Sequence, residues 1–390
     1  MILRPYFIVP KLIPQPTWGG DYISTYKGIT DPKVTSVAIG QSYELSVDSM
    51  LSESLDSTVV PVELGDPKTG NTTATIGNAD QLFSLQSLID QNPEEVLGAK
   101  PVQIQGKRMN VLIKFTQAKG NSFQVHVIPG KEFGHWKPKP ESWYYFEPGK
   151  ATVGLQQPTP ERLADYKNAC EKIAQFAEQM HAEVASKKTS IDEAKKLLLQ
   201  LVATENPLQY VNEVMVAKGA VIDLSAGGIH HSWEEGESIP LGNVVYEVQV
   251  NVMDNECTIR SFDKGKIGSD GTVRPVHIQD YFTALDTDPS HNEVSKILQQ
   301  PETMEDNGVE QTNLFSTPYY TSKEIAFTGT YHGTTNNSFH HVFVKEGSIL
   351  CQSGESTLLA EKGSSVFIPA GLKEYSLVSE FNSQVILTSV

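Results

Sequence analysis

The chain has 390 residues, which is long enough for two or three domains that each bury a core. Its formal net charge of −16, with no run rich in Lys or Arg, argues against nucleic acid and anionic membranes as partners. The three cysteines are far apart without Cys-x-x-Cys spacing, so the sequence suggests neither a disulfide framework nor a thiolate zinc site and predicts reduced thiols in the cytoplasm.

No segment predicts a signal peptide or a membrane span. The amino-terminal sequence MILRPYFIVPKLIPQP is apolar, but prolines interrupt every apolar run in it. No stretch approaches the roughly 18 apolar residues of a spanning helix. We therefore expect a protein that does not associate with a membrane.

Most of the chain predicts short β-strands separated by Gly, Asn, Asp and Pro. Strands at this spacing are typical of a sandwich or a barrel. The predicted strands are KVTSVAIG, VLIKFTQ, SFQVHVI, SWYYFEP, AVIDLSAGG, NVVYEVQVNV and CTIRSFD. The sequence therefore predicts a mainly β fold.

One of these strands, FQVHV, alternates apolar and polar side chains. Phe123, Val125 and Val127 share one face, and Gln124 and His126 share the other. The pattern fits a strand whose polar face meets water, and it also fits a strand whose polar face lines a binding cavity. The strand alone does not decide between the two.

Residues 159–205 interrupt the β pattern and predict two helices. A Thr-Pro-Glu sequence at Thr159 is a helix start, and apolar residues then recur at spacings of three and four as far as Met180. A second helix opens with a capping box at Ser190 and ends before Pro207. The two helices either only pack over one end of a barrel or also help to wall a substrate cleft.

Residues 286–312 are polar, acidic and poor in aromatic residues. Such a composition predicts a linker or a long surface loop. A compact segment rich in strands follows, so we place a domain boundary near residue 310.

Two segments share one layout. Residues 219–230, GAVIDLSAGGIH, and residues 363–374, GSSVFIPAGLKE, each contain a strand, a tight turn that needs a glycine, and a second strand that opens with His230 or Glu374. This layout resembles the second motif of the cupin superfamily of small β-barrels, in which that His binds a metal. The resemblance implies two barrels, of which only the first keeps the His.

Further metal ligands are suggested by the same resemblance. Gln124 and His126 stand in the two places where a typical cupin has His-x-His, and Glu141 opens a later strand where the cupin carboxylate lies. With His230 they form a mixed nitrogen and oxygen set, which suits one zinc ion or another divalent first-row metal. Because only two of the four are histidines, we expect moderate affinity and a site open to solvent or substrate.

The order of several short motifs is similar to a narrower family, the zinc-dependent type I mannose-6-phosphate isomerases. In that order the chain has Gln-Val-His, Lys-x-Glu, Ala-Gly-Gly-Ile-His, Val-Val-Tyr-Glu-Val-Gln, and an Arg followed by an aromatic residue and Asp. The early sequences Trp-Gly-Gly and IGQSYE and the helical insertion also match. The resemblance runs from about residue 15 to the C-terminus.

The family resemblance implies an aldose–ketose isomerase of carbohydrate metabolism that interconverts mannose 6-phosphate and fructose 6-phosphate. It implies four zinc ligands: Gln124, His126, Glu141 and His230. Arg260 and Lys139 match positions with a catalytic role, although Arg260 could instead form a salt bridge to Asp263 or Glu247. Secondary candidates for contacts to the phosphate or the sugar are Ser42, Trp18, Glu247 and Asp263.

The implied fold is mainly β, with two cupin-type jelly-roll barrels and a helical insertion in the first. We expect residues 1–158 to form an N-terminal β region and the first part of the metal-binding cupin, and 159–205 to form the insertion. Residues 206–310 would complete that cupin and include the linker, and 311–390 would form a C-terminal cupin without metal. The expected partner is a small phosphorylated sugar, and the expected state is a monomer or a weak homo-oligomer.

Several positions depart from the family pattern. The usual QVHPDD is QVHVIPG here, SAGG replaces PAGT before His230, and IRSFDKGK lacks the usual end of the Arg motif. These positions surround the cavity, so two alternatives stay open: an isomerase for a different aldose, and a non-catalytic cupin that binds or senses a sugar phosphate. His135, His340 and His341 are expected to be structural or exposed, and Glu374 to lie at the surface or in a turn.

Overall fold

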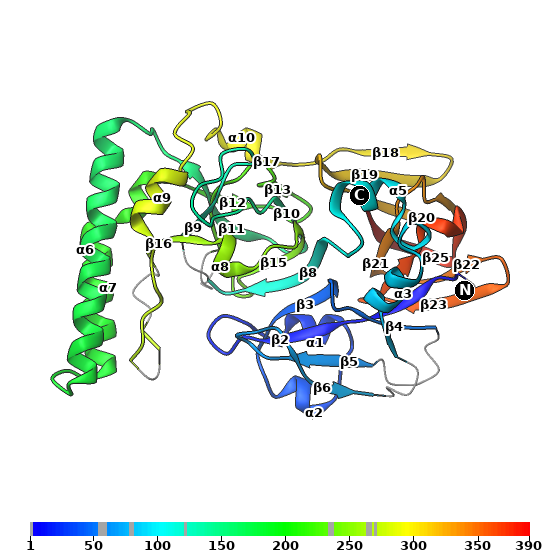
Figure 1. Cartoon of the computed structure of the whole chain (residues 1–390), viewed down its shortest axis with the longest axis horizontal. Helices are drawn as coiled ribbons and strands as arrows, with labels where there is room; N and C mark the ends of the chain where they lie inside the picture. Colours follow the sequence, from blue (N-terminus) through cyan, green and yellow to red (C-terminus); the bar gives the residue numbers. More distant parts are fainter. Residues whose placement is uncertain are drawn as a thin grey trace.

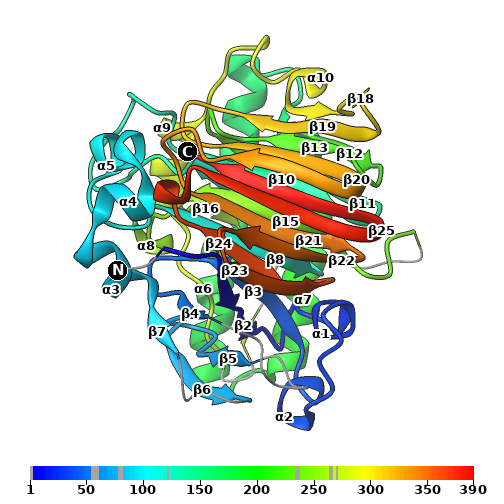
Figure 2. The ribbon, with the colours of Figure 1, turned by 90° about the vertical axis from the view of Figure 1, so that its right-hand side faces the viewer.

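The computed structural model describes residues 3–53, 61–77, 82–120, 123–232, 238–262, 267–268 and 271–390. The fold is mainly β, as the sequence predicts. Within the described residues the strands form sheets of eleven, nine and five strands (Figures 1 and 2). The pairing of these strands leaves each sheet open, so the prediction of two barrels is not confirmed in that detail.

The nine-stranded sheet lies in the middle of the molecule (Figure 1). Its neighbouring strands are antiparallel, except that β2 and β5 run parallel. In spatial order the strands are β17 (Leu298–Gln299), β13 (Val221–Asp223), β10 (Glu141–Tyr145), β15 (Asn243–Val250), β8 (Val111–Ala118), β3 (Ile39–Leu45), β2 (Lys11–Pro14), β5 (Val62–Gly65) and β6 (Thr72–Ile76).

The five-stranded sheet carries the FQVHV strand. Its order is β12 (Val211–Val216), β11 (Gly149–Leu155), β14 (Gly228–Ser232), β9 (Phe123–His126) and β16 (Ile259–Phe262). Phe123 and Val125 share a buried apolar cluster with Tyr166 and Cys170 of helix α6 (Pro160–Ala185). The helical pair of α6 and α7 (Ile191–Glu205) therefore covers the apolar face of this sheet, opposite Gln124 and His126 (Figure 1).

The eleven-stranded sheet contains most of the C-terminal segment. Three short strands from the N-terminal region extend it, because β1 pairs with β24. Its strands are β18 (Thr303–Asp306), β19 (Val309–Ser316), β20 (Thr321–Thr334), β25 (Glu374–Ser389), β21 (His340–Glu346), β24 (Ser365–Ile368), β1 (Tyr6–Val9), β4 (Met50–Ser52) and β7 (Phe83–Ser84), with β22 (Ser348–Ser353) and β23 (Ser356–Glu361) attached beside β25.

The other helices are short. They are α1 (Tyr22–Tyr26), α2 (Pro32–Thr35), α3 (Leu85–Gln91), α4 (Pro93–Leu97), α5 (Ala99–Gln105), the 3₁₀ turns η1 (Pro207–Tyr210) and η2 (Ala370–Leu372), α8 (Asp254–Cys257), α9 (Ile278–Ala284) and α10 (Val294–Ile297). None of the described helices is both long enough and apolar enough to cross a bilayer. The three cysteines are buried and free.

Two sequence predictions are partly wrong. The strand predicted at residues 33–40 begins only at Ile39, because the Asp31 side chain accepts a hydrogen bond from the backbone N–H of Lys33 and caps α2. The loop predicted at 286–312 contains the hairpin of β18 and β19. Its turn is formed by Asn307 and Gly308, which both have positive φ.

Polar contacts join the nine-stranded and eleven-stranded sheets. Tyr144 of β10 and Tyr246 of β15 are cross-strand partners, so both hydroxyls point toward the eleven-stranded sheet. The Tyr144 hydroxyl donates to Glu324 (2.5 Å), and the Tyr246 hydroxyl lies 3.1 Å from Nδ1 of His341. These contacts fix one face of the nine-stranded sheet, hereafter the central sheet, to the eleven-stranded sheet, hereafter the C-terminal sheet. This face of the central sheet lacks the metal-ligand candidates.

Two buried histidines in the C-terminal sheet predict loss of stability in acid. Burial lowers the pKa of His340 to about 4 and that of His341 to about 3. In an unfolded chain a histidine titrates near about 6.5, so below that pH the unfolded state binds protons that the folded state does not. The free energy of unfolding should therefore fall by about 2 kcal/mol for each histidine between pH values of about 7 and about 5.

Urea unfolding at the two pH values measures this loss. His341→Gln should be less stable than the parent near neutral pH, because it loses the contact to Tyr246, but its acid-dependent loss should be about 2 kcal/mol smaller. His332, which is exposed in the same sheet, provides the control variant His332→Gln with the parent's acid-dependent loss. An unchanged loss in His341→Gln would contradict the assignment.

Candidate metal centre

Three buried polar side chains converge between the five-stranded and nine-stranded sheets. His126 comes from β9, His230 from β14 and Glu141 from the start of β10. Oε1 of Glu141 lies 2.9 Å from Nε2 of His230 and 3.6 Å from Nε2 of His126. All three side chains are at most 1% exposed. The two sheets thus bring together three of the four residues that the sequence assigns to a metal.

Backbone carbonyls fix the orientation of both imidazole rings. Nδ1 of His126 lies 2.7 Å from the carbonyl oxygen of Cys257, and Nδ1 of His230 lies 3.3 Å from that of Gly228. In each case Nδ1–H is the donor, which leaves a lone pair on Nε2. Burial also lowers the pKa of His126 to about 4, so this ring is neutral near pH 7. A hydrogen bond from the ring nitrogen that does not bind the metal is typical of metal-binding histidines.

The atoms that face one another need a cation. Nε2 of His126 and Oε1 of Glu141 are buried and make no hydrogen bond among the described residues. Two lone pairs at this distance repel each other, and a buried polar atom without a partner is costly. Tetrahedral zinc ligands at about 2.0 Å from the ion lie about 3.3 Å apart, close to the observed distances. The residues therefore fit a zinc ion.

Gln124 lies beside this cluster on the same face. It is the cross-strand partner of His230 on one side and of Arg260 on the other. Its Nε2 is 2.6 Å from Nε2 of His230, so the amide now donates to the ring. A half-turn of the terminal amide would present Oε1 as a fourth ligand. Gln124 is partly exposed, which makes it the ligand candidate nearest to solvent.

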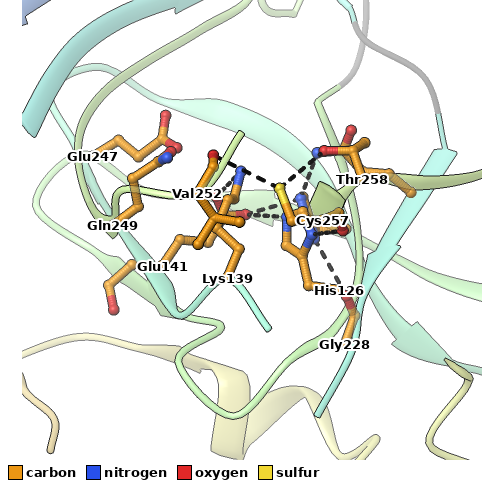
Figure 3. A network of polar contacts seen from close by, with 12 residues as sticks. His126, Lys139, Glu141, Gly228, Glu247, Gln249, Val252, Cys257 and Thr258 are labelled. Carbon is orange, nitrogen blue, oxygen red and sulfur yellow. Dashed lines mark hydrogen bonds and ion pairs between the residues drawn. The ribbon is translucent and has the colours of Figure 1, made fainter. Parts of the chain in front are cut away.

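Lys139 balances the charge of the carboxylate. Its Nζ lies 2.8 Å from Oε2 of Glu141, and both groups are buried (Figure 3). Burial opposes ionisation of Glu141, but Lys139 overcomes it and holds the pKa of Glu141 well below its usual range. Burial likewise opposes the charged form of Lys139, and Glu141 outweighs it and raises the pKa of that ammonium. Lys139 thus occupies one carboxylate oxygen and leaves the other for the cluster.

Sequence reasoning missed Tyr43 and Lys114, which lie on the face of the nine-stranded sheet that carries Glu141. Tyr43, Lys114 and Glu247 are successive cross-strand partners on β3, β8 and β15. Nζ of Lys114 lies 2.8 Å from Oε1 of Glu247, and burial raises the pKa of Glu247 despite this contact. Burial also raises the pKa of Tyr43, to about 12. The signal in the sequence was the lone charge in VLIKFTQ, which the pairing of β8 with β15 places opposite Glu247.

Arg260 of β16 lies on the face of the five-stranded sheet that carries Gln124 and His230. One of its guanidinium nitrogens is 2.6 Å from Asp254, which also accepts a hydrogen bond from the Thr258 hydroxyl. Burial opposes ionisation of Asp254, but Arg260 lowers the pKa of that carboxyl overall. The salt bridge expected for Arg260 is therefore made to Asp254 among the described residues. Asp263, the other expected partner, lies outside them.

The structure places two further candidates away from the cluster. Ser42 is fully buried and is the cross-strand partner of Phe115, so it lies on the opposite face of β3 from Tyr43. Trp18 packs beside Gly40 at the start of that strand. Among the described residues, neither of the two has a hydrogen bond or ion pair to the three converging ligands, and their role as substrate contacts stays a prediction.

Comparison with known proteins identifies the fold. Residues 310–388 match the sequence model of the mannose-6-phosphate isomerase cupin domain. A mannose 6-phosphate isomerase from Bacillus subtilis is similar over 99% of both chains, with a TM-score of 0.65 and 16% identity. A zinc-bound mannose 6-phosphate isomerase is similar over 98% of both chains, with a TM-score of 0.62 and 15% identity.

A putative mannosephosphate isomerase from Archaeoglobus fulgidus has a TM-score of 0.60 and 17% identity, over 100% of this chain and 98% of its own. No curated protein sequence matches this chain. The whole chain therefore has the fold of these isomerases, at a sequence identity of only 15% to 17%.

The converging ligands predict that zinc stabilises the folded protein. One equivalent of zinc should raise the thermal midpoint of chelator-stripped protein, because the ion binds only the folded state. His126→Ala should weaken zinc binding by more than about 100-fold, since even loss of an outer partner of a ligand costs about 10- to 100-fold. Competition with a chromophoric chelator measures the affinity.

His291, an exposed histidine that pairs with Asp286 and is not part of the cluster, provides the control variant His291→Ala. It should bind zinc like the parent. Equal affinity in His126→Ala and His291→Ala would remove the metal site from this position.

Proposed function

We propose that this chain is a metal-dependent aldose–ketose isomerase that interconverts mannose 6-phosphate and fructose 6-phosphate, with one zinc ion per chain. The observation that carries the proposal is the convergence of three buried ligand atoms from His126, Glu141 and His230, of which Nε2 of His126 and Oε1 of Glu141 make no hydrogen bond among the described residues. The motif order and the fold shared with mannose 6-phosphate isomerases support it. The substrate is taken from those relatives.

The charges around the cluster favour an anionic substrate. Lys114, Lys139 and Arg260 balance Glu141, Glu247 and Asp254. The two histidine ligands are neutral when they bind a metal. A divalent ion would therefore leave this group of described residues with a net charge of about +2. A phosphorylated sugar can be attracted locally in this way, although the whole chain is strongly acidic.

The reaction moves a proton between C1 and C2 of the sugar, and negative charge develops on the sugar oxygens. Bound zinc would supply Lewis-acid polarisation of the carbonyl. Lys139 keeps its proton because of Glu141, so it can stabilise that charge as a fixed donor. Arg260 can bind phosphate or the charged sugar oxygens. Glu247, with its raised pKa, can take up a proton and return it.

The remaining assignments follow the same proposal. Ser42, Trp18, Glu247 and Asp263 are proposed contacts to the substrate. The C-terminal residues 311–390 are proposed as a second cupin without metal, beside the parts formed by 1–158, 159–205 and 206–310. We place the protein in the cytoplasm, in carbohydrate metabolism, as a monomer or a weak homo-oligomer.

The direct test is NMR of mannose 6-phosphate incubated with purified protein, in chelator-stripped and zinc-loaded samples. The proposal expects fructose 6-phosphate only with zinc. Turnover of another phosphorylated aldose but not of mannose 6-phosphate would assign a different sugar. Zinc binding and sugar phosphate binding without turnover of any aldose would instead indicate a non-catalytic cupin.

Lys139 allows a sharper test of the site. Lys139→Met should lower kcat by about 100-fold, because it removes one positioned donor from the charge that develops. Lys137, two residues away, is exposed and pairs with Glu256, so Lys137→Met is the matched control with parental kinetics. Steady-state kinetics of both variants with mannose 6-phosphate give the answer. A kcat in Lys139→Met equal to that of the control would exclude Lys139 from the chemistry.

A further inference from the structure

A tyrosine from the C-terminal sheet reaches the strand that carries Glu141. Tyr320 precedes β20 and is 1% exposed, and its hydroxyl lies 3.0 Å from Oγ of Ser142. Ser142 is the residue next to Glu141 and is also fully buried. Because side chains alternate along β10, Ser142 points toward the C-terminal sheet while Glu141 points toward the metal centre.

The donors along this contact can be assigned. Oγ of Ser142 lies 3.0 Å from Oδ1 of Asp223, and a carboxylate accepts only. The single hydroxyl proton of Ser142 is therefore donated to Asp223, so Tyr320 donates to Ser142. Oδ1 of Asp223 also accepts the backbone N–H of Ser225 at 2.9 Å. The result is a chain of hydrogen bonds from Tyr320 to the turn that follows β13, and such chains strengthen cooperatively.

That turn, residues 223–228, contacts all three ligand segments. The backbone N–H of Leu224 donates to the carbonyl oxygen of Glu141 (2.9 Å). A Cβ on Gly227, which has a φ of 84°, would lie 3.1 Å from the carbonyl oxygen of His126, so the turn packs closely on β9. The carbonyl oxygen of Gly228 accepts from the His230 ring.

Tyr320 itself is held rigidly. Oγ1 of Thr317 accepts the backbone N–H of Tyr320 at 3.0 Å and that of Tyr319 at 3.1 Å. The backbone N–H of Thr317 donates in return to the carbonyl oxygen of Tyr320 at 3.0 Å. The hydroxyl therefore projects from a closed turn rather than from a free loop end.

We propose that Tyr320 is a positioning residue for the metal centre, acting through Ser142 and Asp223 to fix the turn that aligns His126, Glu141 and His230. The proposal rests on the metal site of the proposed function but not on which sugar is used. It gives the C-terminal sheet, which has no metal cluster among the described residues, a direct part in metal affinity.

The test is zinc affinity of Tyr320→Phe, which keeps the buried ring and removes only the hydroxyl. The dissociation constant should rise by about threefold to tenfold, less than the about 10- to 100-fold expected for direct partners of ligands. Tyr375→Phe is the matched control. Tyr375 is also buried, and its hydroxyl makes a comparable hydrogen bond to His340 (2.7 Å) within the C-terminal sheet, which the variant loses. The control should lose similar stability but bind zinc like the parent.

Ser142→Ala tests the same chain from its other end. It should raise the dissociation constant at least as much as Tyr320→Phe, and the double variant should show no further loss, because both changes break one chain. Parental affinity in Tyr320→Phe, or the same loss in Tyr375→Phe, would overturn the proposal. Protein that binds zinc without turning over sugar would refute the proposed function and leave this comparison of affinities intact.

Discussion

The buried carboxylate of Glu141 sets the requirements that the surrounding structure meets. A single charge at 1% exposure is very costly unless it is paired. Lys139 pairs with one oxygen, and the other oxygen faces Nε2 of His230 and of His126, whose Nδ1–H groups donate to backbone carbonyls. Nitrogen and oxygen lone pairs cannot stabilise each other, so this half of the carboxylate is complete only with a cation. The site is thus organised around an ion that the side chains alone do not replace.

Strand alternation separates the chemistry from the packing in the central sheet. One row of cross-strand partners is Tyr43, Lys114 and Glu247, on the side of the metal centre. The adjacent row includes Phe115 and Tyr246, which belong to the apolar core shared with the C-terminal sheet. A slip of one residue in register would exchange the two faces and bury the charges in that core. The C-terminal sheet therefore protects the register of the strands that build the site.

Much of the fold and of the candidate metal centre could be predicted from the sequence where local signals agree with the tertiary environment. The FQVHV alternation was ambiguous alone, and its polar face is internal because Glu141 of the nine-stranded sheet lies opposite His126. The helix starts at Thr159 and Ser190 were predictable, because their caps are local. The hairpin at Asn307 was missed although Asn-Gly is a strong turn signal, because exposed strands of polar composition resemble a loop. Arg260 was assigned a catalytic role with a salt bridge to Asp263 or Glu247 as the alternative, and its contact to Asp254 has no local signal in the sequence.

The two repeated motifs differ in their last residue, because only the first lies in the metal centre. Glu374, which takes the place of His230 in the second motif, is exposed, as expected for a residue without a metal to bind. The nearby histidines are buried instead: His340 bonds to Tyr375 inside the sheet, and His341 bonds to Tyr246 of the central sheet. One ring nitrogen of each of these two histidines thus has a fixed tyrosine partner. The C-terminal sheet packs against the central sheet and holds its strands in place. The metal centre can therefore keep ligand atoms without protein hydrogen bonds.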